Sequence, residues 1–147
     1  MARLRRPKYE IEGFLVSEAA IERGKHIRGP EDVVEACRTL ARAQREVFAV
    51  LLLNARHEVI KRVPISVGSL NSSIVHPREV FRPAIIEGAA AIVFVHNHPS
   101  GDPEPSEEDL AITKRLVEAG ELLGIGVLDH VIMGVRGAMS FRARQLL

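Results

Sequence analysis

Cysteine is almost absent from this chain of 147 residues, which contains only Cys37. A single cysteine cannot form an intrachain disulfide, and it argues against a closed structural zinc site built from several thiolates. Cys37 falls on the apolar side of a predicted helix together with Val33 and Leu40. We therefore predict that Cys37 is buried and contributes to packing.

Aromatic residues are also scarce, at 4% of the chain, and tryptophan is absent. Hydrophobic residues nevertheless make up 46%, so the core is predicted to consist mainly of Val, Ile, Leu and Ala. No apolar run approaches the roughly 20 residues needed to cross a bilayer. The basic N-terminal residues do not lead into a signal-peptide core. We expect one globular domain in the cytoplasm, with no membrane partner.

An excess of charge of one sign is missing as well, because the formal net charge is only +1. This value argues against a surface that is basic all over, as dedicated nucleic-acid binders often have. Basic residues still gather near both ends of the chain, at Arg3, Arg5, Arg6, Lys8, Arg136, Arg142 and Arg144. A solvated arm is the simpler interpretation of the first group, and contact with DNA is the alternative.

Hydrophobic periodicity predicts alternating helices and strands. Residues 1–28 carry little periodic signal and are predicted to form a tail with an irregular or helical lead-in, before a single domain over residues 29–147. The predicted helices cover residues 30–43, 77–87 and 106–123, and the predicted strands cover residues 47–53, 58–66, 90–95, 125–133 and 138–141. The wholly apolar run at 90–95 is typical of a central strand in an α/β fold, with both faces covered.

Two histidines stand where that central strand ends. His96 and His98 are two residues apart, so strand alternation places both imidazoles on one face and turns Asn97 away. Asp109 follows in the first turn of the next helix, which can bring its carboxylate back to the strand end. Two histidines and one carboxylate with an open fourth position are typical of a catalytic zinc site, where a bound water is activated for hydrolysis of an amide.

Other interpretations of these residues stay open at this point. Ser106 and Asp109 fit an S-x-x-D capping box, which would explain both residues without a metal ion. Further candidates, either as ligands or as groups that support them, are Asp102, Glu104, Asp129 and His130. For Asp129 and His130, a structural hydrogen-bonded pair is the simpler interpretation.

Amide hydrolysis also needs a group that carries protons and a donor to the oxyanion. Glu46 and Ser106 are our candidates for these roles. Glu46 lies between the first predicted helix and the strand at 47–53, where its carboxylate could face a neighbouring strand end. Spacing alone does not exclude other glutamates, namely Glu58, Glu79, Glu87, Glu104, Glu107 and Glu108.

Together, Glu46 and the run "VHNHPSGDPEPSEEDL" resemble the signature of the JAMM (MPN-plus) metalloproteases. That signature is an upstream Glu, then His-x-His, seven residues, Ser, two residues and Asp. It matches Glu46, His96, His98, Ser106 and Asp109. The segments "SLNSSIVHPREVF", "HNHPSGDPEPS" and "LLGIGVLDHVIMG" are more narrowly similar to the RadC branch. The resemblance covers about residues 27–145.

This resemblance implies a mixed β-sheet flanked by helices, similar to the cytidine deaminase fold. It implies that His96, His98 and Asp109 bind one Zn²⁺, that Glu46 is the general acid/base, and that Ser106 stabilises the oxyanion. RadC proteins usually carry an N-terminal helix-hairpin-helix-like region, which the residues before the predicted domain are too few to contain.

We therefore expect a zinc-dependent peptidase or isopeptidase that acts on a protein or peptide. The alternative is a DNA-associated protein of repair or nucleic-acid processing. A nucleoside deaminase would need H-x-E and P-C-x-x-C motifs, which a chain with one cysteine cannot provide. The sequence leaves open which bond is cut and whether copies of the chain form a homo-oligomer.

Overall fold

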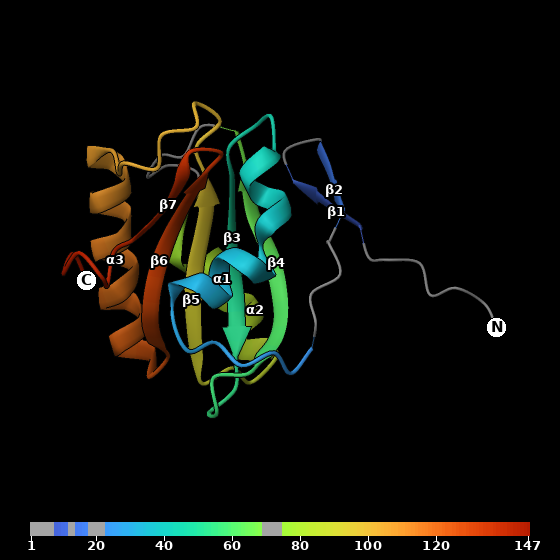
Figure 1. Ribbon diagram of the computed structural model, residues 1–147. Coiled ribbons are helices and arrows are strands. Elements are labelled where there is room, and N and C mark those ends of the chain that lie inside the picture. Colours follow the sequence, from blue (N-terminus) through green and yellow to red (C-terminus); the bar gives the residue numbers. More distant parts are fainter. Residues whose placement is uncertain (1–7, 12–13, 18–22, 69–74) are drawn as a thin grey trace.

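The centre of the protein is a mixed five-stranded β-sheet with the strand order β4-β3-β5-β6-β7. The computed structural model describes residues 8–11, 14–17, 23–68 and 75–147 (Figure 1). The sheet strands are β3 (Val47–Leu53), β4 (Val59–Val67), β5 (Ala91–Asn97), β6 (Gly126–Gly134) and β7 (Gly137–Ser140). β5 and β6 run parallel, and the other neighbours are antiparallel. The predicted α/β class with a mixed sheet is confirmed.

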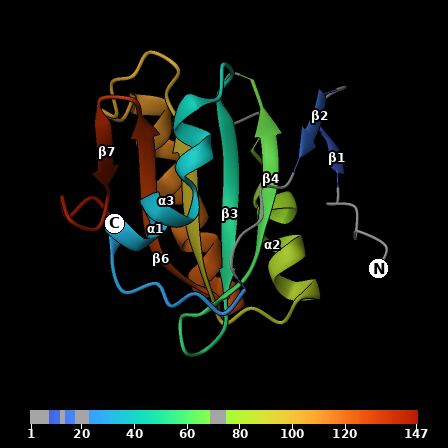
Figure 2. The same cartoon turned by 45° about the vertical axis from the view of Figure 1, so that its right-hand side comes forward.

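Helices cover both faces of this sheet, as Figures 1 and 2 show from two directions. One face carries α1 (Pro30–Ala36) and the short 3₁₀ helix η1 (Arg38–Arg42). The other carries α2 (Pro77–Ile86) and α3 (Glu107–Leu123). The predicted helix at 30–43 is divided in two, because the backbone leaves the α-helical conformation at Cys37 (φ −119°, ψ 21°).

β3 shows why the two covered faces produce an unbroken apolar strand. All seven of its residues are buried. Ala49, Leu51 and Leu53 pack in the cluster that contains α1, whereas the alternate residues pack in the cluster that contains α2 and α3. Cys37 belongs to the first cluster and is fully buried, as predicted.

The described part of the N-terminal region contains strands. β1 (Lys8–Ile11) and β2 (Phe14–Ser17) pair antiparallel, so the expected irregular or helical lead-in is wrong for these residues. Closer to α1, Gly24 N and Ile27 N donate to the carbonyl oxygens of Val59 and His57, and the Ile27 side chain is buried. Packing thus begins before residue 29, although the division of the chain at that point stays a prediction.

The loop between β5 and α3 is held against the turn between β6 and β7. His98 N donates to Met133 O at 2.8 Å, and Arg136 N donates to Gly101 O at 3.3 Å. Gly134 lies so close to this loop that a Cβ atom would stand 2.4 Å from Gly101 O. This close approach fixes the loop that starts at His98 and leads to α3. None of the helices in the described residues is both long and apolar enough to span a membrane.

Candidate metal centre

Four of the predicted site residues come together at one end of the sheet. Glu46, His96, His98 and Asp109, called the ligand cluster below, each present a potential ligand atom, and these atoms lie within 4.8 Å of one another. Glu46 directly precedes β3, which runs antiparallel to β5 and pairs Phe48 with His96. The antiparallel pairing therefore brings the start of β3 to the histidines at the end of β5.

The orientation of His98 is set by a main-chain carbonyl. His98 Nδ1 lies 2.9 Å from Asp102 O, which can only accept a hydrogen bond. Nδ1 therefore carries a proton, so the tautomer that this contact favours has its Nε2 lone pair directed to the ligand cluster. The carboxylate of Asp102 instead accepts from Glu104 N at 3.1 Å, so Asp102 supports His98 through its backbone and its side chain is outside the cluster.

Asp109 serves the cluster and the start of α3 at the same time. Asp109 Oδ2 accepts from Ser106 N at 2.8 Å, and Asp109 N donates to Ser106 Oγ at 3.1 Å, so the predicted capping box is confirmed. Burial raises the pKa of Asp109, but hydrogen bonds to its carboxylate, among them those with the backbone and side chain of Ser106, outweigh that effect and lower the pKa below its ordinary value. Asp109 is therefore an anion at neutral pH.

The distances within the cluster fit a divalent metal ion. His96 Nε2 lies 3.0 Å from His98 Nε2 and 3.3 Å from Asp109 Oδ1, and His98 Nε2 lies 3.1 Å from Asp109 Oδ2. Lone pairs and a carboxylate at these separations repel one another unless a positive charge lies between them. Imidazole nitrogens with a carboxylate oxygen are a donor set that zinc accepts.

Glu46 stands at the outer edge of the cluster. Glu46 Oε1 is 3.6 Å from His96 Nε2 and 3.8 Å from His98 Nε2, which are the longer separations in the group. The Glu46 side chain is 23% exposed, compared with 2% for that of Asp109. A carboxylate that both faces the cluster and reaches solvent is suited to carrying protons.

Asn97, to which the sequence pattern assigned no role, is a further functional candidate. Its Oδ1 accepts from Val47 N at 2.7 Å, and its Nδ2 donates to Ala43 O at 3.2 Å and Arg45 O at 3.0 Å. These three backbone groups flank Glu46 on both sides, so Asn97 fixes the segment that presents the Glu46 carboxylate. The sequence did contain a signal for this role, because Asn97 is a polar residue at a strand position that is predicted to face the core.

His130 lies directly behind the cluster. His130 Nε2 is 2.6 Å from His96 Nδ1, on the side of His96 that faces away from Asp109. Burial is the main cause that lowers the pKa of His130 well below its ordinary value, so the ring is neutral. His130 therefore contacts a candidate ligand directly, as a supporting group would.

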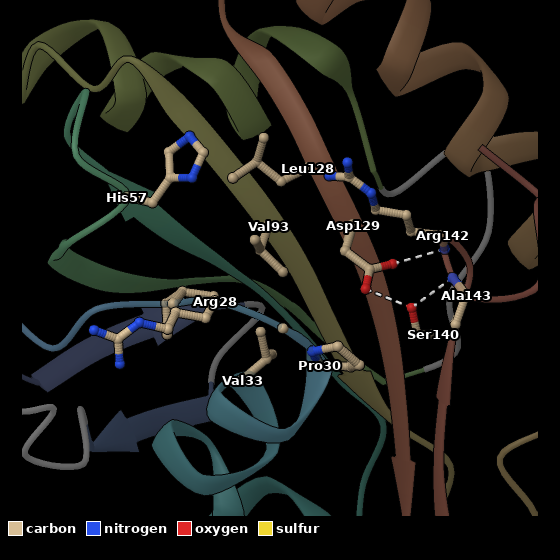
Figure 3. Close-up of a pocket in the computed structure, with 12 residues that line it drawn as sticks. Arg28, Pro30, Val33, His57, Val93, Leu128, Asp129, Ser140, Arg142 and Ala143 are labelled. Atoms are coloured by element: carbon tan, nitrogen blue, oxygen red, sulfur yellow. Dashed lines mark hydrogen bonds between the residues drawn. The ribbon is translucent and has the colours of Figure 1, made fainter.

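Asp129 belongs to the opposite face of β6. Figure 3 shows its carboxylate beside a cavity of about 450 Å³ on the α1 side, where it accepts from Arg142 N at 3.0 Å and contacts the Ser140 hydroxyl. It also accepts from His130 N at 2.7 Å. The predicted hydrogen bond between Asp129 and His130 therefore involves the main-chain nitrogen of His130 and not its ring. Through Ser140 and Arg142, Asp129 also holds the C-terminal segment against β6.

The remaining candidates lie outside the cluster. Glu104 forms an exposed two-point ion pair with Arg144, at 2.6 Å and 3.0 Å, which lowers the pKa of Glu104 chiefly through the hydrogen bond. Arg144 is therefore already paired within the domain. Arg3, Arg5 and Arg6 lie outside the described residues, so the expectation of DNA contact stays a prediction.

Comparison with known proteins agrees with the geometry. A sequence model of the RadC-like JAB domain matches residues 27–146. A UPF0758 protein of Pelobacter propionicus is 60% identical over 104 residues, covering 71% of this chain and 45% of the relative. A UPF0758 protein of Syntrophomonas wolfei is 49% identical over 145 residues, covering 88% of this chain and 62% of the relative. The chain spans about half the length of the curated relatives it matches.

Proposed function

The chain belongs to the RadC-like JAB domain family, and from this premise we propose that it is a zinc-dependent peptidase or isopeptidase. The proposed reaction is hydrolysis of an amide or isopeptide bond in a protein or peptide. The observation that supports it best is the convergence of Glu46, His96, His98 and Asp109 within 4.8 Å.

His96, His98 and Asp109 are the proposed zinc ligands. Their atoms lie 3.0 to 3.3 Å apart, and the two rings come from one strand end while the carboxylate comes from a helix start. When bound, zinc would supply a Lewis acid that activates water and polarises the scissile carbonyl. Three protein ligands with one partly exposed side are typical of catalytic zinc sites, whereas structural sites close with four.

Glu46 is the proposed general acid/base. Its carboxylate faces both histidine Nε2 atoms at 3.6 and 3.8 Å, and its position is fixed by the bonds of Asn97 to the flanking backbone. In the proposed reaction, Glu46 accepts a proton from the attacking water and then donates it to the leaving amine nitrogen. This transfer balances the cleavage, because the amine needs the proton that the water gives up.

Ser106 is the proposed donor to the oxyanion. Its Oγ accepts the Asp109 N–H at 3.1 Å, which orients the oxygen and leaves the hydroxyl proton for donation. Ser106 is exposed at the start of α3, beside a proposed ligand, so a substrate carbonyl can reach it. A hydrogen bond to the negative tetrahedral oxygen stabilises the transition state.

Glu46→Gln tests this proposal, because it removes the proton carrier and preserves the shape of the side chain. Proteins, conjugates and new chain termini would be compared in cells that produce the native protein or the variant. We expect cleavage products to depend on the native protein and to fall about 10²- to 10⁴-fold in rate with purified Glu46→Gln on the substrate so found. Equal products from both proteins would reject the proposed role of Glu46.

A further inference from the structure

A buried hydroxyl group connects α3 with β6 behind the ligand cluster. Thr113 Oγ1 lies 2.6 Å from Asp109 O and 2.6 Å from His130 Nδ1. The carbonyl oxygen can only accept, so the single hydroxyl proton of Thr113 is donated to Asp109 O. Toward His130, the hydroxyl oxygen must therefore be the acceptor.

The direction of this bond fixes the tautomer of His130. Its Nδ1 carries the proton that is donated to Thr113. The ring is completely buried, stacked on Phe141 at 4.5 Å between centroids and in edge contact with Phe48 and Phe94. Such apolar surroundings disfavour a second proton, so His130 Nε2 holds a lone pair and can only accept.

The next bond fixes His96 in turn. His96 Nδ1 lies 2.6 Å from His130 Nε2. Two bare nitrogens at this distance would repel, so His96 Nδ1 must carry a proton and donate it to His130. The tautomer so favoured has its Nε2 lone pair on the opposite side of the ring, 3.0 Å from His98 Nε2 and 3.3 Å from Asp109 Oδ1.

We infer that Thr113 and His130 are positioning residues that hold His96 in the tautomer able to bind a metal ion. This inference rests on the proposed metal site. In the other tautomer, a proton on His96 Nε2 would point into the ligand cluster and prevent coordination. His98 reaches the same tautomer through the carbonyl of Asp102, so the two rings are set by separate hydrogen bonds.

The chain of bonds also joins two proposed ligands. It runs from the main-chain carbonyl of Asp109 through Thr113 and His130 to His96. The helix that presents the carboxylate and the strand that presents the imidazole are therefore held in one hydrogen-bonded unit. The ring of His96 is oriented before any ion arrives, which lowers the ordering needed for binding.

Nitrogen-15 NMR of the imidazole rings tests the inference on the metal-free full chain at mildly alkaline pH. The native protein should show a protonated Nδ1 and a bare Nε2 at His96. Thr113→Val removes the hydroxyl at nearly constant volume, so the His96 signals should move toward the other tautomer. Thr113→Ser keeps the hydroxyl and should restore the native pattern.

Zinc affinity, measured by competition with a chromogenic chelator, provides a second readout. We expect Thr113→Val to bind zinc about 10- to 100-fold more weakly and Thr113→Ser to bind like the native protein. Ser140→Ala is the matched control, because it removes another buried hydroxyl, one that contacts Asp129 on the opposite face of β6. It should leave zinc affinity unchanged.

Three results would overturn the inference: a protonated Nε2 at His96 in the native metal-free protein, an unaltered tautomer and affinity in Thr113→Val, or an equal loss of affinity in Ser140→Ala. The native spectrum decides the question even if Thr113→Val does not fold. A protein with the expected tautomer that binds no zinc would instead reject the proposed function and support the hydrogen-bond chain.

Discussion

Replacing Asn97 with aspartate tests whether this side chain fixes the segment around Glu46. The change converts one amide nitrogen to oxygen and hardly alters the shape. Asn97→Asp keeps the acceptor for Val47 N at 2.7 Å but loses the donors to Ala43 O at 3.2 Å and Arg45 O at 3.0 Å. The new oxygen would face two carbonyl oxygens with no proton between them.

The expected loss follows from these contacts. Each lost hydrogen bond lowers the free energy of unfolding by about 0.5 to 1.5 kcal/mol, and a buried acceptor without a donor costs about 1 to 3 kcal/mol. The bonds of the Asn97 amide nitrogen are only partly buried, so water can replace some of the loss. We expect Asn97→Asp to destabilise the protein by about 2 to 4 kcal/mol near neutral pH.

The stability that Asn97→Asp loses relative to the native protein should depend on pH. Burial raises the pKa of the introduced carboxyl group, so the folded variant binds a proton that the unfolded chain releases. Stability then falls as pH rises, and the deficit relative to the native protein should shrink as pH is lowered from about 7 to about 5. In that range the protonated oxygen can again donate to a carbonyl.

Urea unfolding followed by circular dichroism measures this effect. Asn54→Asp is the matched control, because Asn54 lies in a partly exposed turn where its amide donates only to Glu58 at 3.1 Å. We expect the control to lose only about 1 kcal/mol, because the new carboxylate and that of Glu58 both remain in contact with water, which screens their repulsion. Unchanged stability of Asn97→Asp, or equal losses in both variants, would refute the role assigned to Asn97.

Two further substitutions examine the start of α3 and the loop before it. Ser106→Ala should lose about 1 kcal/mol of stability, as measured by urea unfolding, because the cap on Asp109 N disappears. It should also slow cleavage of the substrate identified in cells, whereas loss of stability alone would contradict the proposed oxyanion role. Gly134→Ala would place a Cβ atom 2.4 Å from Gly101 O and should lower the free energy of unfolding by about 1 to 3 kcal/mol in the same assay. Gly126→Ala is its control, because a Cβ atom there would meet nothing within 4 Å, and its stability should be nearly unchanged. Equal stability of the two alanine variants would contradict the close packing of the loop.

The sequence was sufficient to predict the central strand and its histidines. The apolar run before His96 requires two covered faces, and strand alternation places His96 and His98 on one side. The role of Asp109 could not be decided in the same way, because a capping box and a metal ligand both require a carboxylate at this position. In the structure one carboxylate serves both, since Oδ2 accepts from Ser106 N while Oδ1 faces His96.

The supporting residues depend on strand pairing, which local patterns do not specify. His130 reaches His96 because β5 and β6 are parallel and in the register that pairs Phe94 with His130. Asn97 reaches the backbone around Glu46 because β3 lies beside β5. Glu46 itself was one of several possible glutamates by spacing, and only the family resemblance distinguished it.

The zinc content of the purified full chain, measured by native mass spectrometry, tests the central claim most directly. The ligand cluster predicts about one zinc ion per chain in the native protein and in Glu46→Gln, and none in His98→Ala, which loses a proposed ligand while Glu46 is retained. A native protein without zinc, or a His98→Ala variant that keeps the full amount, would contradict a zinc centre formed by these residues.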